Sequence, residues 1–230
     1  DNSSYYLKIF PGWGSVEIEN YNSLNATDIR KAIYGDGERE TSKIILSASI
    51  SKNVFETINE FPSFEERKRI SSEYWDMKRI KDEASTLKRA PVFITTDAVV
   101  TQSGSVLLVR RKNHPFKGYW ALPGGYLEQD KTLIDNMIKE LREETRLKIP
   151  SKIIKGSIKD NMTVDTIDRD PRGRILTHAY YIDLGYPEEA LPKVAGGDDA
   201  VEAKWFLFSD VKQDQMAFDH WHILIKFGVL

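Results

Sequence analysis

Apolar and polar positions follow different periods in the front and rear parts of this 230-residue chain. The front carries two stretches of helical character, 51–61 and 64–87, and the second mixes apolar residues at helical spacing with many charges. At Pro91 the proline ends the helical pattern, and strand-like residues begin at Val92. We therefore predict two parts, 1–90 and 91–230, with a helical linker at the end of the first.

The rear part alternates short apolar runs with turn residues, and its single long helical pattern is rich in glutamate. The predicted elements are strands at 92–100, 105–111, near 153–159, 174–184 and 201–208, the glutamate helix, and a closing helix from about 216. Because strands are mixed with helices that can cover both faces, we expect an α/β (α+β) fold, a three-layer α/β/α sandwich with a mixed sheet.

The front of the chain opens on an apolar run at 5–10 that has the character of a buried strand. A buried strand needs neighbours on both sides, so we expect the sequence to be a piece of a longer protein. Further along, Asn25 or Thr27 precedes a short helical pattern, and either residue is a suitable helix cap with Asp28 in the first turn.

Composition excludes several classes of function. The net charge is −2, so no basic excess indicates nucleic acid as a partner. There is no cysteine, which rules out disulfides, thiolate metal sites and a cysteine nucleophile. No apolar run approaches the roughly 20 residues that span a bilayer. We expect a cytoplasmic protein without a membrane partner.

Three carboxylates stand close together on the glutamate helix. Glu140, Glu143 and Glu144 are spaced i, i+3 and i+4, and side chains at these spacings are neighbours on a helix. Three negative charges in one place repel unless a cation lies between them, and oxygen ligands of this kind suit Mg²⁺ or Mn²⁺. The plain alternative is a solvated helix face. The other stripe, which includes Met137 and Leu141, is predicted to pack on the sheet while the acids point outward.

The segment 125–147 resembles the signature of the Nudix hydrolases, in which a glycine is followed by a glutamate and then by a helix with further glutamates. The matching residues are Gly125, Glu140, Leu141, Glu143, Glu144 and Leu147. Lys131, Lys139 and Arg146 depart from it, because they stand where the family has a glutamate, an arginine and a glycine. In the family the glutamate and arginine brace the glycine loop against the helix, so we expect two lysines here to repel each other.

Further segments are similar to one Nudix branch, the ADP-ribose pyrophosphatases joined to nicotinamide mononucleotide adenylyltransferases. The matching segments are 106–111, 120–125, 168–174, 196–200 and 217–220. The front resembles the rear part of the adenylyltransferase, a partial α/β nucleotidyltransferase domain, in which Thr27 and Arg30 match positions that hold ATP phosphates. The family's glycine-rich loop and its His-x-Gly-His motif are absent, so we do not expect adenylyltransferase activity of this piece.

This resemblance implies a metal site and a phosphate site in 91–230. Glu140, Glu143 and Glu144, with the backbone carbonyl of Gly124 or Gly125, would hold Mg²⁺ or Mn²⁺, and a metal-bound water would attack the pyrophosphate. Glu143, Glu144 and Asp199 are the candidate catalytic residues.

Arginine binds phosphate oxygens in pairs, so Arg110, Arg172 and Arg174 are expected to contact the substrate, together with Asp198. Each of these arginines could instead be a solvated charge. Asp198 and Asp199 lie on a glycine-preceded loop that could swing over the site, or they are turn residues. The four histidines, Phe116 and Trp120 are expected to be structural.

The predicted function is hydrolysis of ADP-ribose, a small nucleotide, to AMP and ribose 5-phosphate, in a protein of NAD metabolism. Two alternatives stay open. The first is a sensor that binds ADP-ribose without cleaving it, as some relatives of this branch do. The second is a Nudix part that only supports an adenylyltransferase completed by a preceding segment. Assembly as a homo-oligomer is also left open.

Overall fold

A computed structural model describes residues 47–48, 50–60, 64–185 and 190–230. Thr27, Arg30 and the strand expected at 5–10 lie outside the described residues. By their contacts the residues divide into two compact units, Asp1–Ile80 and Lys81–Leu230. The two helices expected in the front are present as α3, Lys52–Glu60, and α4, Phe64–Ser85. The boundary after residue 90 stays a prediction.

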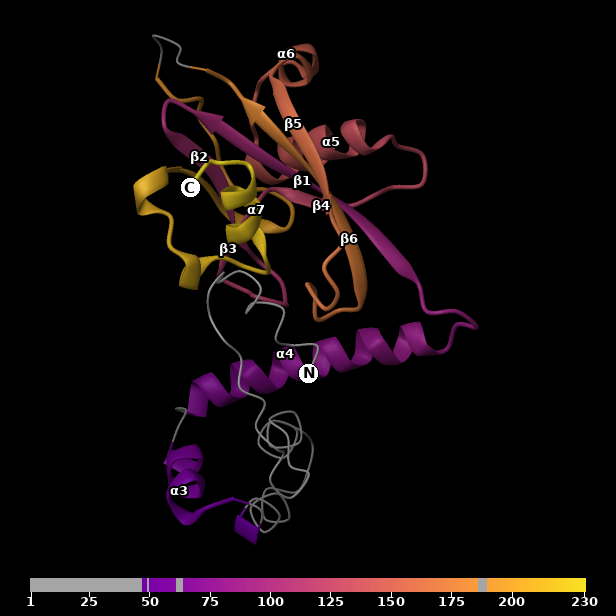
Figure 1. Ribbon diagram of the computed structural model, residues 1–230, viewed down its shortest axis with the longest axis vertical. Helices are drawn as coiled ribbons and strands as arrows, with labels where there is room; N and C mark the ends of the chain where they lie inside the picture. The colour runs from indigo at the N-terminus through magenta and orange to yellow at the C-terminus, as the bar shows by residue number, and fades with distance from the viewer. Residues whose placement is uncertain (1–46, 49, 61–63, 186–189) are drawn as a thin grey trace, which may run out of the picture. The chain divides into compact units, whose positions relative to one another are not determined.

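The second unit is built on a mixed sheet (Figure 1). Its strands are β1 Val92–Gln102, β2 Ser105–Arg111, β3 Trp120–Ala121, β4 Gly124–Tyr126, β5 Ile158–Val164, β6 Arg174–Asp183 and β7 Ala200–Leu207. The main path runs β3-β2-β1-β6-β5, while β4 pairs with β1 and β7 pairs with β2. β1 and β6 are parallel, from Val92 opposite Arg174 to Thr101 opposite Asp183, and the other pairs are antiparallel.

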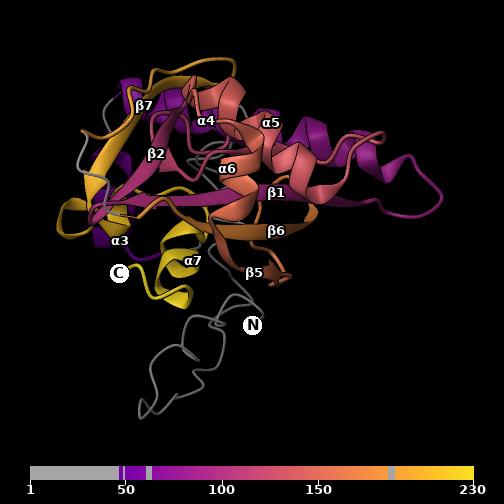
Figure 2. The ribbon, with the colours of Figure 1, turned by 90° about the horizontal axis from the view of Figure 1, so that it is seen from above.

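Helices cover both faces of this sheet (Figure 2). α5, Leu133–Thr145, and α6, Ser151–Gly156, lie on one face, and α7, His220–Lys226, lies on the other. Successive strand residues alternate between the two layers, as the pleat of a strand requires. Ala98 belongs to the core that contains Met137 of α5, whereas Val99 belongs to the core that contains Ile223 of α7. The predicted α/β/α sandwich with a mixed sheet is confirmed.

One predicted strand is wrong. The sequence predicts a strand near 153–159, but 151–156 form the short helix α6 and the strand β5 begins only at Ile158. Pro150 occupies the position before the helix and is compatible with a helix start, and Ile154 is fully buried in the α5 layer. An apolar run this short does not show its period, so the packing decides its structure.

The closing helix also begins later than the residue near 216 that the sequence suggested. Trp120 forms an isolated parallel bridge with Met216, and the Ala217 N–H donates to the Trp120 carbonyl at 2.8 Å. The segment before α7 is therefore held alongside β3, and the helix starts at His220. No helix in the described ranges is long and apolar enough to cross a membrane.

Candidate active site

A cavity of about 430 Å³ opens beside the glycine segment β4 and the helix α5. Six of the predicted site residues line it, namely Gly124, Glu140, Glu144, Arg172, Asp198 and Asp199. Three others, Arg110, Glu143 and Arg174, are not part of its lining. The cavity therefore brings together residues from the glutamate helix, the loop 168–174 and the loop before β7.

The helix α5 presents Glu140 and Glu144 to the cavity because its apolar stripe is fixed in the core. Met137 and Leu141 are fully buried, and Glu140 and Glu144 lie one turn apart on the neighbouring stripe. The prediction that the acids point outward is wrong for Glu144, which is only 8% exposed. Glu143 lies on the rim, with a side chain that is 42% exposed.

Glu144 is a carboxylate in a poorly solvated place. Its Oε2 accepts a hydrogen bond from the Gly124 N–H at 3.0 Å. Burial raises the pKa of Glu144 to about 8, and the negative charges of Glu140 and Asp97 act in the same direction, against the Gly124 hydrogen bond and Arg111. Burial likewise raises the pKa of Glu140, although Lys139 opposes this. A cation bound between Glu140 and Glu144 would favour the ionised form of both carboxylates.

Two glycines allow the chain to approach these acids closely. A Cβ atom at Gly125 would lie 2.5 Å from the Glu140 Oε2, and one at Gly124 would lie 2.2 Å from the Thr96 carbonyl oxygen. Any side chain at either position would collide with the backbone or with the acid. Gly124 is thus required by the close packing of β4 on the β1 backbone, while Gly125 leaves room for the Glu140 carboxylate.

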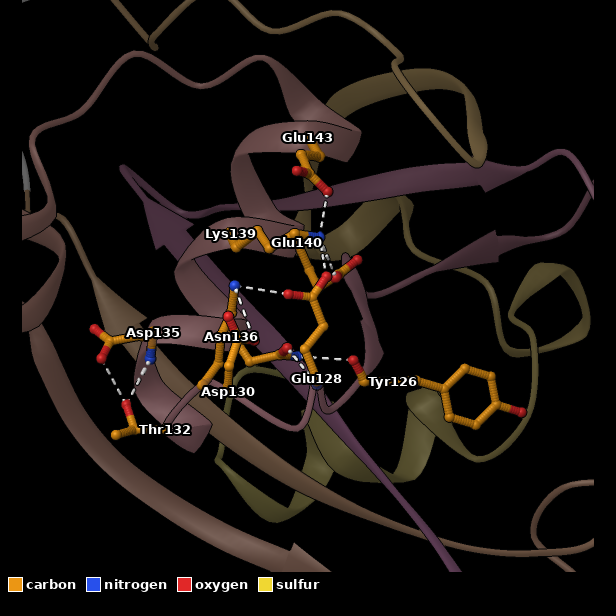
Figure 3. A network of polar contacts seen from close by, with 10 residues as sticks. Tyr126, Glu128, Asp130, Thr132, Asp135, Asn136, Lys139, Glu140 and Glu143 are labelled. Atoms are coloured by element: carbon orange, nitrogen blue, oxygen red, sulfur yellow. Dashed lines mark hydrogen bonds and ion pairs between the residues drawn. The ribbon is translucent and has the colours of Figure 1, made fainter.

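The two lysines that depart from the family pattern do not simply repel each other, because both contact Glu128. The Oε2 of Glu128 lies 2.7 Å from the Lys131 Nζ, and its Oε1 lies 3.1 Å from the Lys139 Nζ (Figure 3). Lys139 also contacts Glu140 Oε1 at 3.0 Å and Glu143 Oε2 at 2.6 Å. The prediction that the two lysines repel each other is therefore wrong. Glu128 binds the ammonium group of Lys131 in the loop and that of Lys139 in α5.

The predicted metal ligands have the right chemical type for a hard divalent ion. They are carboxylates, two of which are partly or largely desolvated, beside a glycine backbone. Among the residues that the structure describes, however, no three acidic or imidazole side chains are grouped around a common point for a metal. Two of the predicted ligands, Glu140 and Glu143, contact the Lys139 ammonium group instead.

Among the arginines, the structure favours Arg111 over its neighbour. Leu107 and Val109 of β2 face the α5 layer, and Arg111 follows at the same parity and lines the cavity. Arg110, at the opposite parity, is exposed, and its Nε donates to the Gly118 carbonyl at 3.1 Å. Strand alternation was the signal that could have identified Arg111 from the sequence.

The loop 168–174 is held by buried ion pairs rather than solvated. Arg169 forms a bidentate pair with Asp219, at 2.9 and 2.6 Å, and both side chains are less than 10% exposed. Arg172 forms a similar pair with Asp170, at 2.9 and 2.7 Å, and its guanidinium lies over the rings of Tyr126 and Phe218. These pairs orient the arginines in the cavity wall.

Arg174 has a structural contact in this arrangement. Its Nη1 donates to the carbonyl oxygens of Asp165 at 2.7 Å and Thr166 at 3.2 Å. The guanidinium therefore closes the loop that leads into β6, outside the cavity lining.

The loop that carries Asp198 and Asp199 is fixed to its surroundings. The Gly197 N–H donates to the Glu144 carbonyl at 3.1 Å, and a Cβ at Gly197 would lie 2.4 Å from the Glu143 carbonyl oxygen. The Lys112 N–H donates to the Asp199 carbonyl at 3.0 Å, and the Asn113 side chain donates to Asp199 Oδ1 at 2.9 Å. These contacts hold the loop to the end of α5 and to the segment after β2, which agrees with the interpretation of Asp198 and Asp199 as turn residues.

Sequence reasoning missed two further cavity residues, Asp97 and His220. Asp97 is 5% exposed and accepts a hydrogen bond from the Thr177 hydroxyl at 2.6 Å. His220 Nδ1 accepts the Leu122 N–H at 2.9 Å, so a neutral ring carries its proton on Nε2, which is 3.9 Å from Asp97 Oδ2. Burial lowers the pKa of His220. These residues meet only through the packing of α7 on β1.

Comparison with known proteins shows the family of this chain. The family model described as NUDIX domain matches residues 92–227, more than half of the chain. The chain belongs to the Nudix family. An ADP-ribose pyrophosphatase of Methanocaldococcus jannaschii is 34% identical over 131 residues, which cover 57% of this Nudix chain and 70% of that protein. These findings confirm the prediction of a Nudix hydrolase.

Solved Nudix structures include a bifunctional NMN adenylyltransferase/ADP ribose pyrophosphatase of Francisella tularensis, complexed with AMP and a manganese ion. It is 31% identical, with a TM-score of 0.82, and the match covers 98% of this chain and 67% of that one. The NUDIX domain of Shewanella oneidensis NrtR, complexed with ADP ribose, is 29% identical, with a TM-score of 0.51 and coverage of 63% and 90%. This Nudix chain thus resembles both a bifunctional enzyme and a NUDIX domain that was solved with ADP ribose.

Proposed function

We propose that the chain hydrolyses the pyrophosphate bond of ADP-ribose to AMP and ribose 5-phosphate with the help of Mg²⁺ or Mn²⁺. The observation that supports this most is that one cavity is lined both by the acids Glu140 and Glu144 and by the arginines Arg111, Arg169 and Arg172. A pyrophosphate linkage needs both kinds of group, because its negative charge must be neutralised while water is activated.

The divalent ion would be held by Glu140, Glu143 and Glu144 with the backbone carbonyl of Gly124. When bound, such an ion neutralises phosphate charge and lowers the pKa of a coordinated water. The desolvated state of Glu140 and Glu144 supports this assignment, since both carboxylates are costly to ionise without a cation.

The arginines would bind the phosphate oxygens. Arg111 uses its Nε to bind the Pro115 carbonyl at 2.8 Å, which fixes the direction of the guanidinium in the cavity wall. Arg172 is oriented by Asp170 and by the rings of Tyr126 and Phe218. Because the arginines are held before substrate arrives, little conformational entropy is lost on binding.

In this proposal Asp199 would take a proton from the attacking water. Its carboxylate lines the cavity, and Asn113 fixes one of its oxygens at 2.9 Å, which leaves the other to accept a proton. Glu143 and Glu144 would act in catalysis through their proposed role as metal ligands. Asp198 would contribute to the substrate-binding wall.

For the front part, 1–90, we propose the rear part of an adenylyltransferase domain, with Thr27 and Arg30 at phosphate positions. Support comes from the Francisella tularensis bifunctional protein, whose match covers 98% of this chain.

An ADP-ribose sensor is the second candidate. The observation in its favour is the contact of Lys139 with Glu140 and Glu143, which places an ammonium group at two of the proposed metal ligands. A 30% identical relative in Acinetobacter baylyi is an ADPR responsive transcriptional repressor, of which this chain covers 44%.

Product analysis separates the two candidates. The purified chain is incubated with ADP-ribose, NAD or an ADP-sugar in the presence of Mg²⁺, and the nucleotides are separated by anion exchange. The proposed hydrolase releases AMP and ribose 5-phosphate in equal amounts from ADP-ribose, faster than from the other compounds. Intact ADP-ribose, together with saturable binding in calorimetry, would contradict hydrolysis and support the sensor.

A further inference from the structure

Lys139 occupies an unusual position for a helix-surface lysine. Its Nζ contacts the carboxylates of Glu128, Glu140 and Glu143, at 3.1, 3.0 and 2.6 Å (Figure 3). An ammonium group has three N–H donors, and here each of them has a carboxylate partner. The side chain is 28% exposed, so solvent screens these contacts only in part.

These contacts use oxygen atoms that the proposed metal ion needs. Glu140 and Glu143 are two of the three proposed ligands, and a divalent cation must bind the same lone pairs. The fixed positive charge would also repel the incoming ion at short range. Lys139 and the metal therefore compete for Glu140 and Glu143.

Glu128, the third partner of Lys139, is not among the proposed ligands and is held in place independently of them. Its other oxygen contacts the Lys131 Nζ at 2.7 Å. The Glu128 N–H donates to the Asn136 side chain at 3.0 Å, and Asn136 is fully buried, where it donates to the Thr96 hydroxyl at 2.9 Å. The carboxylate of Glu128 is thus pre-positioned beside Lys139.

We infer that Lys139 is a built-in counter-ion that a divalent cation displaces from Glu140 and Glu143, and that Glu128 retains the ammonium group after the displacement. This inference rests on the proposed metal site. Lys139 and Glu128 are positioning residues in this scheme, since they set how readily the cation binds. The same contacts keep the carboxylate helix neutralised when no divalent ion is bound.

The test is a Mn²⁺ titration of the whole chain without substrate, followed by electron paramagnetic resonance of the free ion. Lys139→Met removes the competing charge and keeps the apolar stem, so Mn²⁺ should bind about tenfold more tightly. Glu128→Gln removes the group that draws Lys139 away, so binding should weaken by about three- to tenfold. In the double variant there is no ammonium to retain, so its dissociation constant should equal that of Lys139→Met.

Two controls isolate the charge of Lys139. Lys139→Arg keeps the charge and must not show the tighter binding. Lys155→Met removes a lysine that contacts Asp135 and has no contact with Glu128, Glu140 or Glu143 among the described residues, so it should stay within about twofold of the original chain. Melting curves in chelator verify folding, and Lys139→Gln replaces Lys139→Met if the latter does not fold.

Three outcomes would overturn the inference. Unchanged or weaker Mn²⁺ binding in Lys139→Met would show that Lys139 does not compete. A double variant weaker than Lys139→Met would show that Glu128 is itself a ligand. If the original chain binds no Mn²⁺, the metal site of the proposed function fails and the inference fails with it, whereas normal Mn²⁺ binding with the wrong signs in the variants rejects the inference alone.

Discussion

The loop 168–174 and the acidic face of α5 contribute to the same cavity but differ in how their charges are compensated. In the loop, Arg169 pairs with Asp219 and Arg172 pairs with Asp170, each through two hydrogen bonds. On α5, Glu144 is 8% exposed, accepts the Gly124 N–H and forms no ion pair within the described part of the chain. The charges of the loop arginines are therefore compensated by carboxylates of the chain, and Lys139 compensates Glu140 and Glu143 on the helix, whereas the carboxylate of Glu144 has no cationic partner among the described residues.

The largest effect is expected on the helix side. Glu144→Gln should lower kcat for ADP-ribose by about a thousandfold, because a neutral amide is a poor ligand for a hard cation. Steady-state AMP release measures this. Glu202→Gln makes the same chemical change at an exposed position of β7 and should leave kcat unchanged. A nearly normal rate for Glu144→Gln would remove Glu144 from the metal site.

On the loop side the expected effect is on stability. Asp219→Asn leaves Arg169 buried without its counter-charge, which should lower the free energy of unfolding by about 3–5 kcal/mol. Urea denaturation measures it, with Asp160→Asn at an exposed position of β5 as the control. If Asp219→Asn were as stable as the control, the loop would not depend on its ion pairs.

The buried carboxyl group of Glu144 should also make the free energy of unfolding depend on pH. The pKa of Glu144 is about 8 in the folded chain and about 4.5 unfolded, so the folded state holds an extra proton between these values. The stability contribution of this group is present below pH 4.5 and is lost as pH rises to 8. In chelator, the free energy of unfolding of Glu144→Gln, relative to that of the original chain, should therefore rise by roughly 2–4 kcal/mol between pH 5 and pH 8. A constant difference in urea denaturation would contradict the burial of an ionisable acid.

A smaller effect separates two adjacent arginines. Arg111→Ala should lower kcat/KM by about 10- to 100-fold, since Arg111 lines the cavity, whereas Arg110→Ala should change it less than about twofold. Steady-state kinetics with ADP-ribose compare the two. The reverse order would restore the first interpretation of the sequence and place Arg110 on the phosphate.

The pattern of apolar and polar residues predicts the features of the molecule that depend only on residues close together in the sequence. The strands β1 and β2 follow from short apolar runs bounded by turn residues, and the apolar stripe of α5 follows from its period of 3.6 residues. The spacing of Glu140 and Glu144 also placed both acids on one side of a helix. The alternation of side chains between the two faces of β2 also distinguishes Arg111, on the cavity side, from Arg110.

The remaining features depend on contacts between distant segments. Asp97 meets His220 because α7 packs across β1, and Arg169 meets Asp219 across 50 residues of sequence. Glu128 compensates the charges of Lys131 and Lys139, and this contact depends on the conformation of the loop, which the spacing of residues in the sequence does not reveal. The region 153–159 was misassigned because burial of Ile154, rather than strand propensity, decides its conformation.

Binding of a divalent cation at the acidic face of α5 should make the rate of AMP release from ADP-ribose depend on the concentration of free Mg²⁺ or Mn²⁺. We expect no release in chelator and a rate that rises with metal and then saturates. A rate that is the same in chelator and in saturating metal would contradict it.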